Sequence, residues 1–431
     1  MNTIGSKTAH LELVRTELQK CSKCGECTSV CPVYRETREE KFVARGKLAL
    51  AEAVLSHKLP MTDEFYDVLN NCILCLSCVE KCPSGVRVDK IVSCTRYDLI
   101  ADRGLPLYKQ FLFSMLRAGR HGVDFFFRSG SLAQRVLFRR IPDNSGLKRR
   151  FPMPVFDGER YVPHFARHPF RCYSPEFLPA PQRRKTVLFF TGCCANYIYT
   201  GIAEDTIYTL NALGIDVIVP RDQACCGAPV HASGDLNTSL VLARRNIEAL
   251  DTRWRNFDIV TVCSSGGHML KTKYTELLEN NAEYFTMAKN VSRRTFDISE
   301  YLIHKIGASR IQKRLQRRWS QKTTYHDPCH LRKGQGVFEE PRELIKIVAG
   351  DRFVELANAE ACCGSGGFYG LAHKETSLKI LSKKTDRIVE IGADAVVTGC
   401  PGCIIQLKDG LRRKEKTTQV FHIIEILAQC L

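Results

Sequence analysis

Long hydrophobic runs are missing from this sequence of 431 residues: no apolar stretch approaches the ~18 residues that a membrane-spanning helix requires. The first residues, from Met1 to Lys7, also lack the apolar core of a secretory signal peptide, so we expect a cytoplasmic chain. Acidic residues are outnumbered, with 46 Asp and Glu against 63 Lys and Arg, and the formal net charge is +17. Hydrophobic residues make up 44%, enough for the cores of about two to four domains.

Motifs of the common catalytic and nucleotide-binding sites are equally scarce. The glycine-rich stretch from Gly364 to Gly370 is not a G-x-G-x-x-G sequence that follows a strand, so nucleotide binding is not expected there. Neither a catalytic triad nor a pair of carboxylates suited to acid–base catalysis is visible. Without a flavin or nicotinamide motif, the chain cannot by itself take a hydride from an organic substrate, because that chemistry belongs to a cofactor.

Cysteine, in contrast, is abundant: the chain has 21. In a chain without an export signal, so many cysteines indicate metal binding rather than disulfides. Eight of them form two copies of the pattern C-x2-C-x2-C-x3-C-P, at residues 21–32 and 72–83. This is the spacing by which bacterial-type ferredoxins hold [4Fe–4S] clusters.

Each copy of the pattern supplies three thiolates on one loop and a fourth, before the proline, that reaches the other cluster. We therefore assign the ligands to two [4Fe–4S] clusters, one held by Cys21, Cys24, Cys27 and Cys82, the other by Cys72, Cys75, Cys78 and Cys31. Two structural zinc sites are the alternative, since C-x2-C pairs also suit tetrahedral zinc. Two identical quartets that each end in Cys-Pro favour the clusters.

The segments around these loops have the spacing of helices, which we predict over residues 8–20, 42–55 and 63–69. Residues 105–141 are apolar and basic together. This favours a pair of amphipathic helices that packs on its own domain or lies on a membrane or a partner. Residues 142–181 hold eight prolines and are predicted to form an extended linker without regular elements.

The rest of the chain contains an internal repeat. The first copy predicts strands at 186–190, 216–219 and 258–262, with helices at 203–213 and 235–250; the second predicts strands from Thr323, at 353–356 and at 395–398. The spacing from Cys225 to Cys362 and from Cys263 to Cys400 is 137 residues in both cases, which indicates duplication.

Strands that alternate with helices in this way indicate a parallel sheet, at whose carboxyl edge ligands bind. The repeat places its cysteines at those strand ends. The glycine of each Cys-Cys-Gly sequence is expected at a close backbone approach or at a positive φ.

These patterns predict an α+β multidomain chain. We expect an α-helical ferredoxin domain with two [4Fe–4S] motifs at 1–104 and an amphipathic, basic and proline-rich linker at 105–184. Two duplicated α/β domains with parallel sheets then follow at 185–305 and 306–431.

The first domain resembles the α-helical ferredoxin module of respiratory iron–sulfur subunits, and the repeat resembles the cysteine-rich CCG domain of heterodisulfide reductase-type subunits. The complete order is similar to the iron–sulfur subunits of glycolate oxidase and their relatives in lactate and anaerobic glycerol-3-phosphate oxidation. For the second repeat, this resemblance implies a third iron–sulfur cluster, with the ligands Cys329, Cys362, Cys363, Cys400 and Cys403.

The first repeat departs from the family pattern. It keeps Cys193, Cys225, Cys226 and Cys263, but Gly266 stands where the last cysteine is expected. Three alternatives stay open: a fourth cluster with Cys194 as the substitute ligand, an ordinary four-thiolate cluster, or a repeat that is only structural. His326 and His330 flank Cys329 and are either hydrogen-bond donors to cluster sulfur or ordinary histidines. No role is assigned to Cys94, Cys172 or Cys430.

The basic surplus is local. Residues 117–185 contain fifteen Lys and Arg against five Asp and Glu, and residues 301–326 contain seven Lys and Arg and no acid. Nucleic acid is not expected, because no binding motif accompanies these charges. An acidic partner, an anionic membrane surface that residues 105–185 contact, or a merely solvated face are the alternatives.

The resemblance implies an electron-transfer subunit. A FAD-containing dehydrogenase partner would oxidise a 2-hydroxy acid, glycolate or lactate, and electrons would pass singly through the clusters to a quinone or another carrier. The chain would then be cytoplasmic, with a peripheral contact at the inner face of the membrane. The main alternative is a heterodisulfide reductase-like subunit that reduces a disulfide or another substrate at the second-repeat cluster. A zinc-stabilised binding module is the third hypothesis.

Overall fold

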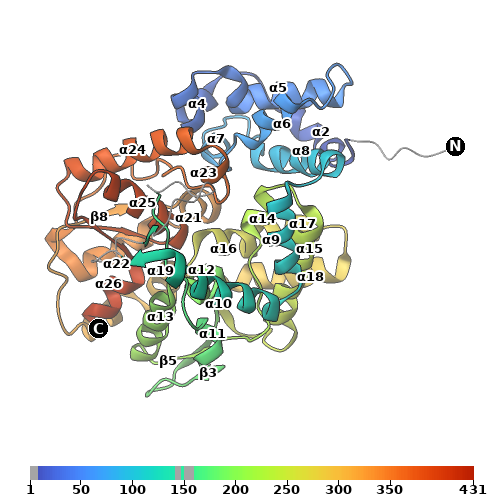
Figure 1. The fold of residues 1–431 in the computed structure, drawn as a ribbon. Helices are drawn as coiled ribbons and strands as arrows, with labels where there is room; N and C mark the ends of the chain where they lie inside the picture. Colours follow the sequence, from blue (N-terminus) through green and yellow to red (C-terminus); the bar gives the residue numbers. More distant parts are fainter. Residues whose placement is uncertain (1–7, 141–146, 150–159) are drawn as a thin grey trace. The chain divides into compact units, whose positions relative to one another are not determined.

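The computed structural model describes residues 8–140, 147–149 and 160–431, and Figure 1 shows its ribbon. The chain divides into two compact units that are not contiguous in sequence. Unit 1 contains the described residues up to Ser114 together with Gly227–Ser239 and Cys362–Ser382; unit 2 contains the described residues of Met115–Cys226, Leu240–Ala361 and Lys383–Leu431. In the described ranges, each helix is too short or too polar to cross a membrane.

Unit 1 is helical and is organised around the long helix α8 (Val88–Arg103), against which α1, α5 and α6 pack. Helix α8 ends at Gly104, whose φ of +75° a residue with a side chain rarely adopts. Thr62 caps α6, since its hydroxyl accepts a 3.1 Å hydrogen bond from the backbone N–H of Phe65. The other elements of unit 1 are α1 (Ala9–Glu12), α2 (Arg15–Gln19), α3 (Glu26–Val30), α4 (Pro32–Thr37), η1 (Glu40–Phe42), α5 (Ala44–Leu55), α6 (Asp63–Asn70), α7 (Ser77–Glu80), α14 (Ala228–Ala232) and α23 (Tyr369–Ala372).

The helices predicted at 42–55 and 63–69 are confirmed as α5 and α6. The helix predicted over 8–20 is instead two short helices, α1 and α2, interrupted at Leu13 and Val14. The predicted amphipathic pair within 105–141 is confirmed as α9 (Leu107–Arg117) and α10 (Arg120–Leu137).

The described part of unit 2 contains two sheets of three or more strands and a short two-stranded one. The five-stranded sheet has the order β3-β5-β4-β6-β7, and all its pairs are parallel except β3 with β5. The three-stranded sheet has the order β10-β9-β8 and is parallel throughout. The strands are β3 (Phe177–Leu178), β4 (Lys185–Phe190), β5 (Ile215–Ile218), β6 (Asp258–Thr261), β7 (Thr295–Asp297), β8 (Thr323–His326), β9 (Ala395–Thr398) and β10 (Gln419–His422).

The two sheets show the predicted duplication. When β5-β4-β6-β7 is compared with the second sheet, β4 corresponds to β8, β6 to β9 and β7 to β10. The second-repeat counterpart of β5 was predicted as a strand at 353–356, and this prediction is wrong: the only pairing there is an isolated parallel bridge between Phe353 and Thr323. β5 is paired on both sides, by β4 and β3, whereas Phe353 has a neighbour on one side within the described residues.

Helices cover both sheets of unit 2, and the predicted helices at 203–213 and 235–250 are confirmed as α13 and α15. The principal helices are α12 (Gly192–Tyr197), α13 (Thr200–Ala212), α15 (Leu236–Ile247), α16 (Ser264–His268), α17 (Tyr274–Leu277), α18 (Ala282–Arg294), α19 (Ile298–Tyr301), α20 (Ala308–Arg314), α21 (Cys329–Gln335), α22 (Glu339–Ala349), α24 (Lys374–Glu390), α25 (Pro401–Arg413) and α26 (Ile423–Cys430). Helices α9, α15 and α24 cross the boundary between the units in sequence.

The proline-rich segment was predicted to lack regular elements. Part of it lies outside the described residues, but the described part contains α11 (Phe170–Tyr173) and strand β3, so the prediction is wrong there. A short antiparallel pair also joins β1 (Phe138–Arg140) to β2 (Leu147–Arg149). Strand β3 forms because its backbone pairs with the outer edge of β5, whose hydrogen-bonding groups would otherwise lack partners on that side.

Candidate metal centres

The eight cysteines of the two ferredoxin-type loops surround two neighbouring cavities in unit 1. One cavity is lined by Cys31, Cys72, Cys75 and Cys78. The other is lined by Cys21, Cys24, Cys27 and Cys82, and also by Cys78. These are the quartets assigned above, in which each loop gives three thiols to one cavity and its last cysteine to the other. The ligand assignment itself stays a prediction, which this placement supports.

The two loops share an unusual backbone conformation. Lys23 and Gly25 flank Cys24 with φ values of 60° and 88°, and Leu74 and Leu76 flank Cys75 with 56° and 64°. A left-handed residue other than glycine costs roughly 1–2 kcal/mol, so the second loop carries strain that its own sequence does not relieve. The three cysteines of each loop line one common cavity, as a cluster requires.

Hydrogen bonds and charge around these cavities also suit an anionic cluster. The backbone N–H of Val86 points to Cys82 Sγ at 3.4 Å, and the hydroxyl of Ser77 lies 3.4 Å from Cys75 Sγ. Lys47 is only 3% exposed, donates to the carbonyl of Phe42, and is a neighbouring positive charge to the cysteines of the first cavity. A cluster with four thiolates carries about −2, which this buried ammonium offsets.

Burial raises the pKa of the thiols of Cys27, Cys31 and Cys78, and for Cys78 the rise is large. The physical cause is that a lone thiolate loses hydration in the protein interior, and neighbouring thiolates repel it. Iron binds the thiolate form, so loading of these sites must release protons. Cys94 is buried on α8 and is not among the lining residues of either cavity.

The five cysteines of the second repeat divide between the two compact units. Cys362 and Cys363 belong to unit 1, and Cys329, Cys400 and Cys403 belong to unit 2. In unit 1 the N–H of Gly364 donates to Cys362 Sγ at 3.3 Å. The positive φ expected of the two Cys-Cys-Gly glycines is confirmed, at +80° for Gly227 and +81° for Gly364.

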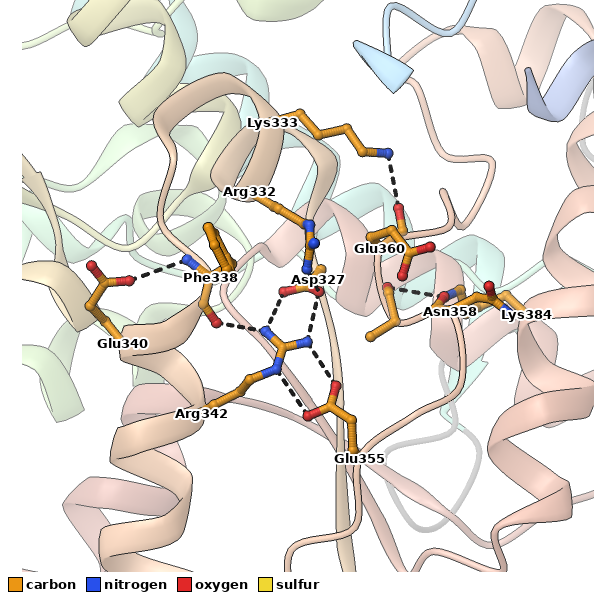
Figure 2. A network of polar contacts seen from close by, with 11 residues as sticks. Asp327, Arg332, Lys333, Phe338, Glu340, Arg342, Glu355, Asn358, Glu360 and Lys384 are labelled. Atoms are coloured by element: carbon orange, nitrogen blue, oxygen red, sulfur yellow. Dashed lines mark hydrogen bonds and ion pairs between the residues drawn. The ribbon is translucent and has the colours of Figure 1, made fainter. Parts of the chain in front are cut away.

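A polar network positions the second-repeat loops of unit 2 (Figure 2). Arg342 donates to both carboxylate oxygens of Asp327 at 2.9 and 2.8 Å, and to both oxygens of Glu355 at 2.9 and 2.7 Å. Asp327 is 1% exposed and lies two residues before Cys329, and its own N–H donates to the carbonyl of Ala359. Lys384 donates to the carbonyls of Asn358 and Ala359, so the chain that leads to Cys362 is held from two sides.

Cys263 and Cys400 occupy equivalent positions in the two repeats. Each directly precedes a helix, α16 or α25, and their backbone angles nearly coincide: φ −136° and ψ 111° for Cys263, φ −143° and ψ 117° for Cys400. Cys403 lies in the first turn of α25, and Gly266 holds the same place in α16. The first repeat therefore keeps the backbone that presents the last ligand and lacks only its side chain.

In unit 2 the first-repeat cysteines meet a cysteine of the second repeat. The thiol of Cys193 is hydrogen-bonded to that of Cys225, and the thiol of Cys263 is hydrogen-bonded to that of Cys400. Burial raises the pKa of Cys194 to about 12, and the neighbouring thiols of Cys400 and Cys225 contribute to the rise. The sequence reasoning missed this convergence, because it treated each repeat as a separate site.

Hydrogen bonds hold these cysteine loops of unit 2 in place. The side chain of Asn246 donates to the carbonyl of Cys225 at 3.0 Å, and the hydroxyl of Tyr274 donates to the carbonyl of Cys226 at 2.9 Å. His330 Nδ1 lies 3.1 Å from the hydroxyl of Ser265, which shows one partner for this histidine. Its predicted contact with cluster sulfur stays a prediction, as does that of His326. Cys172 donates to Asp124 at 3.7 Å, and Cys430 is buried.

Tyr369 is a residue of unit 1 that the sequence reasoning missed. It is 5% exposed, its hydroxyl donates to Asn71 Oδ1 at 3.0 Å, and burial raises its pKa. Cys72 and Cys362 are among its charged neighbours, so one buried aromatic ring adjoins cysteines from both the ferredoxin-type loops and the second repeat. No sequence signal pointed to it, because the contact joins residues about 300 positions apart.

Two family models match the chain: the 4Fe–4S dicluster domain at residues 17–86 and the cysteine-rich CCG domain at residues 187–271 and 323–408. A probable glycolate oxidase iron–sulfur subunit of Bacillus subtilis is 30% identical over 422 residues, which cover 96% of this chain and 94% of that protein. The chain belongs to the glycolate oxidase iron–sulfur subunit family.

Other members of this wider group have different names. One subunit of a dihydromethanophenazine:CoB–CoM heterodisulfide reductase from Methanosarcina acetivorans is 24% identical over 437 residues, covering 96% of this chain and 94% of that protein. Among solved structures, a hypothetical protein from Helicobacter pylori has a similar fold, with a TM-score of 0.52 at 11% identity over 98% of this chain and 76% of that one. The chain is thus an iron–sulfur subunit of an oxidoreductase, as the sequence predicted.

Proposed function

We propose that this chain is the electron-transfer subunit of a flavin-dependent 2-hydroxy-acid dehydrogenase, with glycolate or lactate as the substrate class. A FAD-containing partner would oxidise the hydroxy acid, and this chain would pass the electrons on to a quinone or another carrier. The relative from Bacillus subtilis, named a probable glycolate oxidase iron–sulfur subunit, supports the substrate class. The chain has no flavin motif of its own, so the hydride chemistry must be supplied by the partner.

The observation that carries the proposal is that the two four-cysteine cavities share a wall. Cys78, Ala44 and Val88 line both, so clusters in the two cavities would be neighbours. Neighbouring clusters accept and release one electron at a time, which suits a flavin that delivers two electrons in single steps. We propose the two quartets of residues 21–82 as the ligands of these two clusters.

The CCG repeats would add further redox centres. We propose a third cluster at Cys329, Cys362, Cys363, Cys400 and Cys403, and we keep a fourth at Cys193, Cys225, Cys226 and Cys263 as an alternative to a structural first repeat. The domain limits 1–104, 105–184, 185–305 and 306–431 also remain our proposal, as does a cytoplasmic chain that contacts the inner membrane face through the basic residues 105–185.

Two measurements test this function. Anaerobically purified protein should contain about twelve irons if three clusters are present, and about eight if only the two cavities of unit 1 are loaded. Mixed with its flavoprotein and a hydroxy acid, it should show reduced-cluster signals in electron paramagnetic resonance, and none without the flavoprotein. Oxidation of the hydroxy acid by the purified chain alone would refute the proposal, and stoichiometric zinc without iron would replace it with the zinc-stabilised module.

A second candidate function is reduction of a disulfide at the CCG repeats. The observation that favours it is the convergence of Cys263 and Cys400 within unit 2, together with the complete cysteine set of the second repeat. If it is correct, chemically reduced protein will cleave a heterodisulfide in the absence of the flavoprotein. If the reduced protein leaves the disulfide intact while its clusters remain loaded, the relay function stands alone.

A further inference from the structure

Unit 1 contains a cavity of about 250 Å³ beside the cluster cavity lined by Cys72. Its walls come from five segments of the unit: α6 with the second ferredoxin-type loop, Arg96 on α8, the start of α9, and the two segments near residues 230 and 370. We propose that this cavity binds the head group of a quinone, the acceptor to which the chain delivers its electrons. This inference deepens the proposed function and rests on it.

The size and walls of the cavity suit a single flat ring. Ligand pockets usually measure ~300–1,000 Å³, so a cavity of about 250 Å³ is too small for a dinucleotide or a flavin. Four aromatic residues line it: Tyr66, Tyr108, Phe368 and Tyr369. Such walls favour a planar ring by stacking and by exclusion of water.

The polar groups of the cavity suit a neutral ligand with carbonyl oxygens. Lys109 is 8% exposed, its ammonium lies 5.5 Å from the ring centre of Phe368, and it forms no ion pair with any described residue. His373 lines the cavity and packs on Tyr369, with ring centres 5.0 Å apart. Asp67 also lines the cavity, so its carboxylate would repel an anionic ligand. A quinone is neutral, and one carbonyl oxygen can accept a hydrogen bond from Lys109.

Arg96 also lines the cavity, but its guanidinium already donates hydrogen bonds to backbone carbonyl groups, so we do not assign it to the ligand. It donates to the carbonyls of Leu69 at 2.6 Å, Ala232 at 2.6 Å and Cys72 at 2.8 Å. Arg96 therefore fixes the wall between the two cavities rather than the ligand. Cys72 and Ile73 line both cavities, so a quinone ring would lie directly next to a proposed cluster ligand.

Reduction of a quinone in this cavity would convert it to a quinol. A quinone takes up two electrons, delivered one at a time through the proposed cluster at Cys72, and two protons that come from water. Both carbonyl groups become hydroxyl groups as two O–H bonds form. Lys109 holds a proton at its ammonium beside one carbonyl oxygen, and water restores that proton after transfer. Leu107 and Phe111 are 82% and 64% exposed on the same helix, α9, where an isoprenoid tail can lie.

The test uses the full-length, cluster-loaded protein and a short-chain quinone that carries an azido group. After illumination, the label should be found in the peptides that contain Tyr108 and Lys109 or Phe368 to His373. In equilibrium dialysis with the unmodified short-chain quinone, Lys109→Met should raise the dissociation constant about tenfold or more, because it removes a hydrogen bond from a charged donor. The matched control is Lys379→Met, an exposed lysine on α24 that does not line the cavity.

A second variant guards against misfolding. Tyr108 is 57% exposed, so Tyr108→Ala should leave the fold intact and still weaken quinone binding. The control Tyr208→Ala, at a tyrosine that is 50% exposed in unit 2, should leave quinone binding unchanged. Unchanged binding in both cavity variants, labelling elsewhere, or displacement of the label by glycolate would overturn the quinone site. Those results would leave the electron-transfer function standing if the flavoprotein still reduces the clusters. Failure of that cluster reduction would refute the function on which the inference rests.

Discussion

Replacing Gly266 by cysteine would give the first repeat the last ligand that the second repeat has in Cys403. Gly266 lies in α16 at the position that Cys403 occupies in α25. A Cβ atom added to Gly266 would lie 3.6 Å from the Cβ and 3.8 Å from the Sγ of Cys263, and 3.6 Å from Phe190. These are ordinary van der Waals distances, so the Cβ of a new side chain fits without displacement of its neighbours.

The expected effect on stability is small. Glycine is about 1 kcal/mol less favourable than alanine in a helix and cysteine is intermediate, so Gly266→Cys should change the free energy of unfolding by no more than about 0.5 kcal/mol. The neighbouring Gly267 provides the contrast. A Cβ there would lie 2.6 Å from Oε1 of Gln335, whose amide donates to the carbonyls of Ser264 and His330. Gly267→Ala should therefore cost about 1–3 kcal/mol by overpacking.

Iron and sulfide analysis of the anaerobically reconstituted protein is the assay. If the missing thiol is what keeps the first repeat empty, Gly266→Cys should take up about four more irons per chain than the natural sequence. Gly266→Ser is the matched control, since it fills the same space with a hydroxyl that does not replace a thiolate ligand. Equal iron in the Cys and Ser variants, with both folded, would refute the reasoning. A marked loss of stability in Gly266→Ser would show that the space is not open.

Three further predictions concern buried charges. Asp327→Asn should destabilise the protein by about 2–4 kcal/mol in chemical denaturation, because it leaves the guanidinium of Arg342 with only Glu355 as an anionic partner; an effect below 0.5 kcal/mol would show that the network is not structural. Lys47→Met should make the adjacent cluster harder to reduce in a redox titration, since it removes a buried positive charge; an unchanged or higher potential would contradict this. His422 is fully buried, and desolvation lowers its pKa to about 4, so the unfolded chain binds the proton more tightly than the folded one. The free energy of unfolding should therefore fall by up to about 3 kcal/mol as the pH drops from 6.5 toward 4. His422→Asn should flatten this pH dependence.

The geometry of His422 explains why protonation is unfavourable. Its Nε2–H donates to the carbonyl of Val262 at 2.9 Å, and its Nδ1 accepts from the backbone N–H of Ile424 at the start of α26 at 3.2 Å. A proton on Nδ1 would turn that acceptor into a second donor. Equal melting temperatures of the protein at pH 4.5 and at pH 7 would contradict this interpretation.

The sequence was informative wherever chemistry depends on local spacing. The cysteine loops and the positive φ of the Cys-Cys-Gly glycines follow from neighbours in the chain, and the 137-residue register follows from the repetition of such local motifs. Contacts across long separations did not follow, and Tyr369 beside Cys72 and Cys263 beside Cys400 carry no periodic signal. The strand expected at 353–356 failed for the same reason, because a strand forms only where a partner supplies its hydrogen bonds.

The positive charge of the chain has two different sources in the structure. Part of it is internal: Lys47 and Arg96 are buried within unit 1, and both have Cys72 as a charged neighbour. Burial lowers the pKa of both groups, because each loses hydration of its charged form. An anionic cluster in the adjacent cavity would compensate for that desolvation. The stretch of basic residues at 301–326 contains none of the proposed ligands. Lysine and arginine residues that are buried beside anionic clusters add to the net charge of the sequence without adding to the charge of the surface. They therefore weaken the inference from net charge to nucleic-acid binding.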